Sequence, residues 1–266
     1  MPGGREFRGV GGGEVKSTCC FSGKVADYAR HRERYSSEIL LPVLREYCGL
    51  TPEWHVADIG AGTGMLSDVF LANGNCAVAV EPNAEMREMC LRLHEGNSSL
   101  RVVEGTAEAT GLDSASVDMV VVGRAMHWFD PGPSMTEFRR ILKPGGWVAV
   151  VAFGRTEQGH EENEELEKVL RAYSEDHADT HAGYKVYREL PKYLTRDFRH
   201  EELISSMSLD WKSLHGLVMS LSASPLPSDG IYPEFERAIR ALFDRYAQDG
   251  SFVLQTRYWI NLGRFE

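Results

Sequence analysis

The sequence predicts an α/β domain in which helices cover both faces of a doubly wound, mostly parallel sheet. Short valine-rich segments alternate with amphipathic segments between about residues 37 and 153. The valine-rich segments are continuously apolar, as in parallel strands that are buried on both faces. Several of them end in loops that hold glycine or acidic residues, and doubly wound sheets bind their ligands at such strand ends.

The elements follow one another in regular order along this part of the chain. We expect helices over residues 37–47, 64–73, 83–94 and 134–142, and strands over residues 54–59, 76–80, 100–104, 117–122 and 147–153. Asn83 suits the N-cap of the third helix, because its side chain can accept a hydrogen bond from the first helical turn. The Lys-Pro-Gly-Gly run at 143–146 is expected to end the fourth helix.

Four regions follow from this pattern. Residues 1–20 are rich in glycine and are expected to form a mobile leader. Residues 21–153 form the ligand-binding core. Residues 154–250 are interpreted as a helical insertion or cap with one strand near 203–209, and residues 251–266 as a final strand that completes the core sheet.

Composition and charge exclude several classes of function. The net charge is −10 and the pI is about 5.4, which argues against broad nucleic-acid binding, because that requires a basic surface. The sequence has neither a long apolar run nor a signal peptide, so we expect a cytoplasmic protein without a membrane segment. The five cysteines lack the spacing of a metal site, and no metal is expected.

A glycine loop follows the first predicted strand and begins the next helix. Gly60, Gly62 and Gly64 give the spacing GxGxG, where backbone must take unusual conformations or approach a ligand closely. The dinucleotide fingerprint GxGxxG needs its third glycine at the position of Met65. The loop therefore predicts a nucleoside-type cofactor and argues against a nicotinamide dinucleotide.

Two further strand ends carry candidate cofactor ligands. Glu81 ends the second predicted strand, where a carboxylate can accept two hydrogen bonds from a ribose diol. Dinucleotide enzymes need the same group, so Glu81 alone does not separate the cofactors. Pro82 is expected to wall the adenine. Backbone amides of the loop after the third strand, with Thr106, Ala107 and Glu108, are expected to face the adenine edge. The side chain of Thr106 or Glu108 either holds the exocyclic amine of the adenine or caps the next turn.

These motifs together resemble one enzyme family. The stretches VADIGAGTG (56–64), VEP (80–82), VEGTAE (103–108) and ILKPGG (141–146) resemble class I S-adenosylmethionine (SAM)-dependent methyltransferases of the small-molecule type 11 branch. The resemblance implies a Rossmann-like sheet of seven strands whose last strand is antiparallel, with SAM as cofactor. It also implies that Glu81 holds the ribose, that the glycine loop lies against the methionine part, and that Asp58 reaches the amino group, often through water. Gly123 is a further candidate for cofactor binding.

Two other stretches narrow the resemblance. AMHWFD (125–130) and FSGKVADYARHR (21–32) are similar to segments of trans-aconitate methyltransferase-like enzymes. By this resemblance, Tyr28 and Arg32 contact the methionine end of the cofactor. Arg124 departs from the family pattern, and we weigh two roles for it: attraction of an anionic acceptor, or a structural ion pair.

His127 is the candidate catalytic residue. An imidazole titrates near neutrality and can take a proton from a hydroxyl or amine acceptor. Alternatively, His127 only orders its loop or packs on the cofactor. The remaining histidines, His94 among them, show no ligand spacing and are expected at the surface.

The sequence thus predicts a SAM-dependent methyltransferase that acts on a small molecule by in-line displacement at an oxygen, nitrogen or carboxylate. Positioning supplies much of the rate in such a reaction, because the sulfonium is already a good leaving group. Two alternatives are kept: a non-catalytic SAM-binding or partner subunit on the same fold, and a nicotinamide oxidoreductase.

Overall fold

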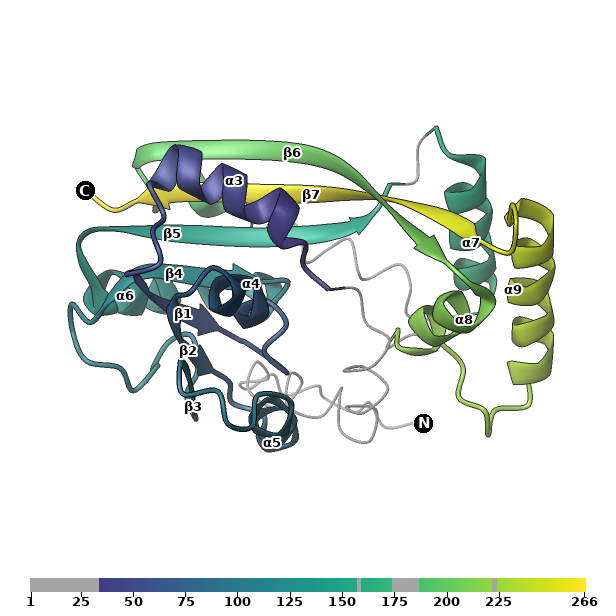
Figure 1. Ribbon diagram of the computed structural model, residues 1–266, viewed down its shortest axis with the longest axis horizontal. Coiled ribbons are helices and arrows are strands. Elements are labelled where there is room, and N and C mark those ends of the chain that lie inside the picture. Colours follow the sequence, from purple (N-terminus) through teal and green to yellow (C-terminus); the bar gives the residue numbers. More distant parts are fainter. Residues whose placement is uncertain (1–33, 157–158, 174–186, 222–223) are drawn as a thin grey trace, which may run out of the picture.

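The computed structural model describes residues 34–156, 159–173, 187–221 and 224–266. A seven-stranded sheet with the order β3-β2-β1-β4-β5-β7-β6 runs through the molecule (Figure 1). Its strands are β1 (His55–Ile59), β2 (Cys76–Val80), β3 (Leu100–Val103), β4 (Val117–Gly123), β5 (Leu142–Arg155), β6 (Arg196–Leu209) and β7 (Phe252–Arg264). The predicted number of strands is confirmed.

The direction of the strands also agrees with the prediction. Strands β1 to β5 pair in parallel, whereas β7 is antiparallel to both of its neighbours, β5 and β6. The chain builds outward from β1 to β3 on one side and from β4 to β5 on the other. The strand order therefore reverses between β1 and β4, and a doubly wound sheet binds ligands at such a point.

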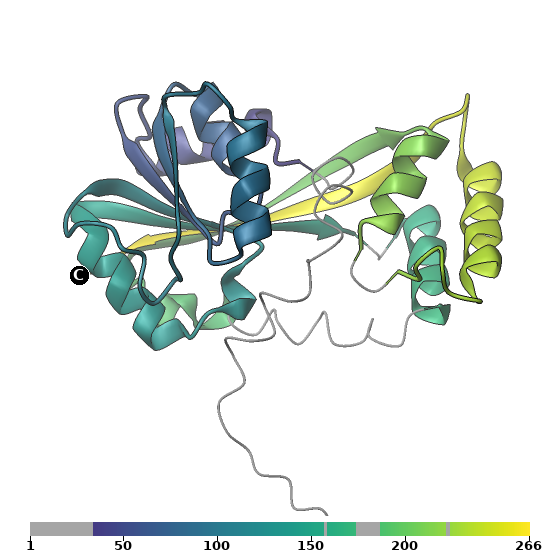
Figure 2. The same cartoon turned by 90° about the horizontal axis from the view of Figure 1, so that it is seen from below.

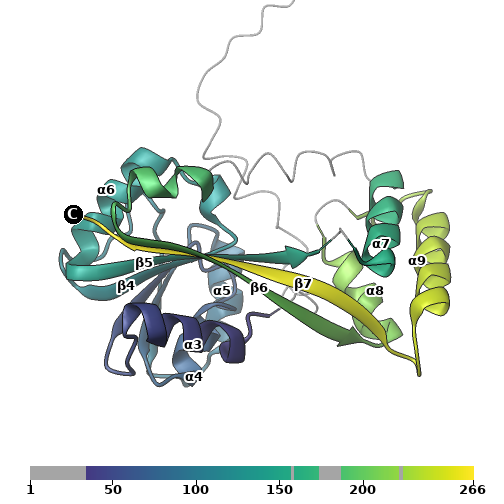
Figure 3. The same cartoon turned by 90° about the horizontal axis from the view of Figure 1, so that it is seen from above.

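Helices cover both faces of the core sheet, as expected. Figure 3 shows α3 (Ser37–Cys48) and α4 (Ser67–Ala72) on one face and α6 (Pro131–Ile141) on the other. Alternate side chains of the strands point to opposite faces of the sheet. Met119 and Val121 pack in the apolar cluster with α3 and α4, while Val120 and Val122 pack in the cluster with α6. This double burial explains the continuous apolar runs in the sequence.

Local signals in the sequence set several helix ends. Helix α5 (Ala84–Leu93) begins after Asn83, whose side chain accepts a hydrogen bond from Met86 N at 3.0 Å, as predicted for an N-cap. Helix α4 begins only at Ser67, three residues later than expected, because the glycine loop continues as turns through Leu66.

Strands β6 and β7 extend beyond the core and carry a helical lobe (Figures 2 and 3). We define this lobe as α7 (Glu161–Ala172), α8 (Trp211–Met219) and α9 (Tyr232–Tyr246). It has its own apolar cluster, in which Leu166, Leu214 and Phe235 meet Phe252 of β7. Among the described residues, no helix is both long and apolar enough to cross a membrane.

Strand β6 is longer than the sequence indicated. The expected strand covered residues 203–209, whereas β6 spans Arg196–Leu209 and pairs with β7 over nearly its full length. Residues 196–202 are mostly charged, so their apolar pattern is weak. They form a strand nonetheless, because β6 is the edge of the sheet and leaves many of its side chains in solvent.

Candidate functional site

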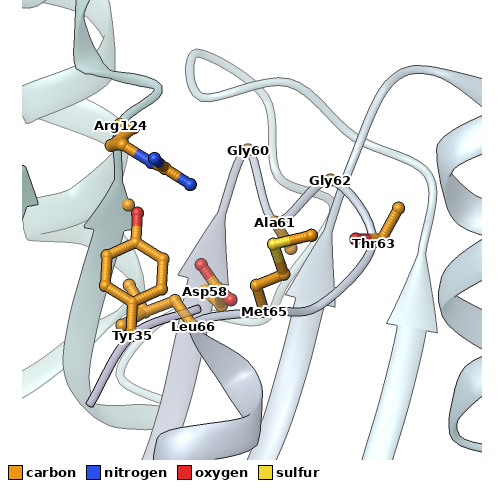
Figure 4. A pocket seen from close by; sticks show the side chains of 10 residues that line it. Tyr35, Asp58, Gly60, Ala61, Gly62, Thr63, Met65, Leu66 and Arg124 are labelled. Atoms are coloured by element: carbon orange, nitrogen blue, oxygen red, sulfur yellow. The ribbon is translucent and has the colours of Figure 1, made fainter. Parts of the chain in front are cut away.

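A small pocket lies where the strand order reverses, between the ends of β1 and β4 (Figure 4). Its cavity volume is about 40 Å³, which is room for a few water molecules or one small polar group. It is lined by Tyr35, Asp58, Gly60, Ala61, Gly62, Thr63, Met65, Leu66, Gly123 and Arg124. Four of the predicted cofactor residues, Asp58, Gly60, Gly62 and Gly123, therefore meet around one cavity.

The three glycines of the loop serve different purposes. All have positive φ, at 69° for Gly60, 58° for Gly62 and 86° for Gly64. A Cβ at Gly60 would lie 2.7 Å from Ala125 Cβ, and one at Gly64 would lie 2.7 Å from His94 Cε1. A Cβ at Gly62 would meet nothing within 4 Å. Gly60 and Gly64 are thus required for packing, while Gly62 leaves open space.

Asp58 is the last residue but one of β1, beneath this loop, and is 1% exposed. Its Oδ2 accepts a hydrogen bond from Ser67 Oγ at 2.7 Å, but its Oδ1 accepts none from any residue that the structure describes. Burial raises the pKa of Asp58 to about 7. A buried oxygen without a partner is costly in a folded protein, so this atom suits a donor on a ligand.

Glu81 connects the end of β2 to the glycine loop. Its Oε2 accepts a hydrogen bond from Gly62 N at 2.9 Å, and its Oε1 accepts one from Asn83 N at 2.9 Å. The side chain is largely buried, and burial is the main cause of its raised pKa. Each carboxylate oxygen can accept a second hydrogen bond, so Glu81 keeps capacity for a diol. The neighbouring Pro82 carbonyl accepts a hydrogen bond from Arg87 Nη1 at 2.6 Å.

The loop after β3 is held by its own side chains. Thr106 Oγ1 accepts a hydrogen bond from Ala109 N at 3.2 Å, and Ala107 is buried in the core. Glu108 Oε1 accepts hydrogen bonds from Asp130 N and Ser134 Oγ, both at 3.0 Å, at the start of α6. The structure thus gives Thr106 and Glu108 a role in shaping the loop, and neither lines the pocket among the described residues.

His127 lies in a short 3-10 helix, η1 (Met126–Trp128), after β4. Its ring centroid is 4.8 Å from that of Trp128, and desolvation by the surrounding protein lowers its pKa from the ordinary value. His127 is nonetheless exposed to solvent. His127 is not among the described residues that line the pocket. The adjacent Phe129 instead packs against Gly60.

Tyr35 and Arg124 also line the pocket, although neither was assigned to the cofactor from the sequence. Tyr35 precedes α3 and packs edge-on against Phe153 of β5, with ring centroids 5.0 Å apart. Arg124 follows β4, and its guanidinium carbon lies 4.3 Å from the centroid of the Phe153 ring. No local pattern links these positions, because the pairing of β4 with β5 and the packing of the segment before α3 on the sheet bring them together. Tyr28 and Arg32, which were predicted to contact the cofactor, lie outside the described residues.

The known proteins that this chain resembles are described as methyltransferases. Residues 57–150 match the family model described as "Methyltransferase domain". The chain is 36% identical over 141 residues to an uncharacterized methyltransferase of Mycobacterium bovis, a match that covers 52% of this chain and 54% of that protein. It is 29% identical over 203 residues to an uncharacterized methyltransferase-like protein of Schizosaccharomyces pombe, covering 76% and 77% of the two chains. The chain thus spans about half the length of its mycobacterial relative.

The fold has a solved counterpart. A structure described as a candidate type II methyltransferase from Anaeromyxobacter dehalogenans superposes with a TM-score of 0.63 at 24% identity. The superposition covers 88% of this chain and 97% of that one. This similarity supports the Rossmann-like fold.

Proposed function

We propose that the chain is a SAM-dependent methyltransferase that acts on a small-molecule acceptor. The pocket between β1 and β4 carries the proposal, because it combines an open glycine loop with the buried, unsatisfied Asp58 Oδ1. The match of residues 57–150 to a methyltransferase domain supports the same conclusion.

The residues present fit SAM at three points. Asp58 offers a buried acceptor for the ammonium group of the methionine part. Gly62 has no Cβ where the loop faces open space, so the backbone can approach a ligand closely. Glu81 is fixed by two backbone amides in the orientation from which it can also accept from the ribose hydroxyls. We keep Pro82 and residues 106–108 as the adenine side of the site.

When bound, SAM supplies an electrophilic methyl group on a sulfonium. The protein then has to position the acceptor in line with that methyl group and exclude water, and it needs no covalent nucleophile of its own. For a hydroxyl or amine acceptor, we propose that His127 takes the proton at an imidazole nitrogen. Its lowered pKa keeps the ring neutral at pH 7, which is the form that can accept a proton.

We propose that the helical lobe and the strands that carry it contact the methyl acceptor and not the cofactor. The lobe has a separate apolar cluster and extends from the part of the sheet beyond β5, on the side away from β2 and β3. A small acceptor also agrees with the net charge of −10, which does not favour a nucleic acid.

Isothermal titration calorimetry with S-adenosylhomocysteine (SAH) tests cofactor binding directly. We expect the wild-type protein to bind, and Glu81→Ala to weaken binding by about 1–3 kcal/mol through loss of the diol hydrogen bonds. Glu104→Ala is the matched control, because Glu104 is an exposed carboxylate that pairs with Arg87. Absence of binding to the wild-type protein rejects the function, and an unchanged affinity in Glu81→Ala rejects the ribose assignment.

Turnover is tested separately from binding. The protein is incubated with SAM and mixtures of small phenols, amines and carboxylic acids, and released SAH is measured. SAH formation that depends on one mixture supports the enzyme. Binding without turnover in every mixture supports the non-catalytic alternative on the same fold.

A further inference from the structure

We propose that Arg124 binds the α-carboxylate at the methionine end of the cofactor, while Asp58 binds the neighbouring ammonium group. The proposal rests on the proposed function, since it names the part of SAM that this pocket holds. It also gives Arg124 a role in cofactor selection, beside the anionic-acceptor and structural ion-pair roles considered from the sequence.

The backbone of Arg124 is the first observation. Its φ is 53°, in the left-handed region that residues other than glycine rarely adopt. The conformation is fixed, because Arg124 N donates a hydrogen bond to Val151 O of β5 at 3.0 Å. A strained backbone that the surrounding sheet holds in place is typical of residues whose side chain is needed at a site.

The aromatic surroundings of the guanidinium are the second observation. The Arg124 Cζ atom lies 4.3 Å from the ring centroid of Phe153 and 5.5 Å from that of Tyr35. Phe153 stacks in turn on Tyr258, its partner across β5 and β7, with centroids 4.9 Å apart. Such stacking restricts the side chain before any ligand binds, which lowers the entropy cost of binding.

Tyr258 is itself anchored, because its hydroxyl accepts a hydrogen bond from Ser36 N at 2.9 Å. The three rings therefore form one rigid support beneath Arg124. The planar guanidinium can then present two parallel N–H donors, which is the geometry that a carboxylate accepts best.

The distribution of charge in the pocket identifies the ligand group. Asp58 reaches the pocket from the end of β1, and Arg124 reaches it from the residue after β4, with the glycine loop beside them (Figure 4). An amino acid carries an ammonium and a carboxylate on the same carbon, so an acidic and a basic side chain in one small pocket match both groups. An anionic acceptor would explain a basic side chain at this place, but it would leave the buried Asp58 Oδ1 without a donor.

Comparison of two ligands tests the proposal. SAH carries the amino-acid end, whereas 5′-methylthioadenosine has the same nucleoside and thioether without it. We expect Arg124→Asn to weaken SAH binding about 10- to 100-fold, the loss of a charge-assisted hydrogen-bonded pair, and to leave 5′-methylthioadenosine binding unchanged. Asparagine is chosen because it tolerates the left-handed backbone. Arg124→Lys, which keeps the charge without the planar fork, should lose less.

The matched control is Arg199→Asn. Arg199 of β6 also stacks on an aromatic ring, that of Tyr47 at 4.5 Å, and neither residue lines the pocket. The Arg199→Asn variant should bind both ligands with the affinity of the wild-type protein. Thermal unfolding followed by circular dichroism verifies that each variant folds. Unchanged SAH binding in Arg124→Asn, or an equal loss for both ligands, overturns the proposal. If the wild-type protein binds neither ligand, the proposed function itself fails.

Discussion

His94 Nε2 lies 2.8 Å from Asp68 Oδ1, which joins the C-terminal end of α5 to the first turn of α4. The other ring nitrogen, Nδ1, lies 2.8 Å from the Cys90 carbonyl oxygen. Both partners are acceptors, so the ring donates from both nitrogens and is positively charged. The same ring packs against Gly64, where a Cβ would lie 2.7 Å from Cε1. This pair therefore holds the end of the glycine loop.

Replacement of His94 is expected to destabilise the protein. His94→Gln should lower the free energy of unfolding by about 1–3 kcal/mol, because it breaks a charge-assisted hydrogen bond of a largely buried ring. Urea unfolding at pH 7 measures this loss. His215→Gln is the control, since His215 pairs with Glu236 on more exposed helices of the lobe and should change stability less.

The difference in unfolding free energy between the wild-type protein and His94→Gln should also depend on pH. Hydrogen bonding to Asp68 is the largest cause that raises the pKa of His94, from 6.5 to about 10. A group whose pKa is raised by folding stabilises the protein fully below its unfolded value, and that contribution is lost as the pH rises through the folded value. The difference in unfolding free energy should therefore be largest below pH 6.5 and become smaller toward pH 10. If this difference is constant over the range, His94 is not positively charged in the folded protein.

Glu137 provides the opposite pH dependence. Its side chain accepts hydrogen bonds from Thr110 N, Thr110 Oγ1 and the guanidinium of Arg140, and the Arg140 contact is the largest cause that lowers its pKa to about 2. This stabilisation is present above pH 4.5 and is lost as the pH falls toward 2. Glu137→Gln should cost about 1–3 kcal/mol at pH 7. Acid titrations of unfolding should show the two proteins converging at low pH.

An exposed ion pair serves as the control for Glu137. Glu189 and Lys192 lie 3.0 Å apart with side chains 48% and 69% exposed, and such pairs contribute little to stability. Glu189→Gln should leave the unfolding free energy and its acid dependence unchanged. If Glu137→Gln behaves in the same way, Glu137 does not fasten the loop after β3 to α6.

Gly62 should affect binding more than stability. Gly62→Ala places a Cβ in the left-handed region at a cost of about 1–2 kcal/mol, although no neighbouring atom would clash with it. We expect it also to weaken SAH binding in calorimetry, because the open space at Gly62 is where the cofactor is proposed to lie. Gly49→Ala is the matched control: Gly49 has φ 73° and open surroundings, but caps α3 away from the pocket. A similar SAH affinity in the two variants would contradict the placement.

The sequence carried the local signals of this fold and lacked the long-range ones. The glycine loop, the Asn83 cap and the continuous apolar strands are each encoded within a few residues, and each prediction agrees with the structure. The expectation that His94 lies at the surface was wrong: its side chain is 8% exposed. Its partner Asp68 is distant in the sequence, and only the packing of α5 beside α4 brings the two together.

The pocket likewise combines residues from a local motif with residues that meet only through tertiary structure. Asp58 and Gly60 could be predicted from the loop motif, since strand, loop and helix are consecutive. The support beneath Arg124 could not, because Phe153 and Tyr258 meet only through the antiparallel pairing of β5 with β7. The first half of β6 is mostly charged, because the strand lies at the edge of the sheet. The apolar pattern of the sequence therefore predicts a strand that is too short.

Asp58 should couple cofactor binding to the release of a proton. Burial raises its pKa from 3.8 to about 7, so the free protein holds Asp58 partly protonated at neutral pH. A ligand ammonium beside it favours the carboxylate and expels that proton. SAH affinity should therefore increase as the pH rises through 7, and calorimetry in buffers of different ionisation enthalpy should detect the released proton. The unligated fold should lose stability as the pH rises from 3.8 to about 7, because only the folded state holds the Asp58 proton in that range.

Asp58→Asn separates this effect from other titrations. The amide keeps the size of the side chain and can still accept from Ser67 through its oxygen, but it cannot ionise. Binding of SAH should become weaker, independent of pH near neutrality and free of proton release. 5′-Methylthioadenosine has no ammonium group, so its binding to the wild-type protein should show neither effect. Proton release with both ligands would assign the titration to another group and remove Asp58 from the ammonium site.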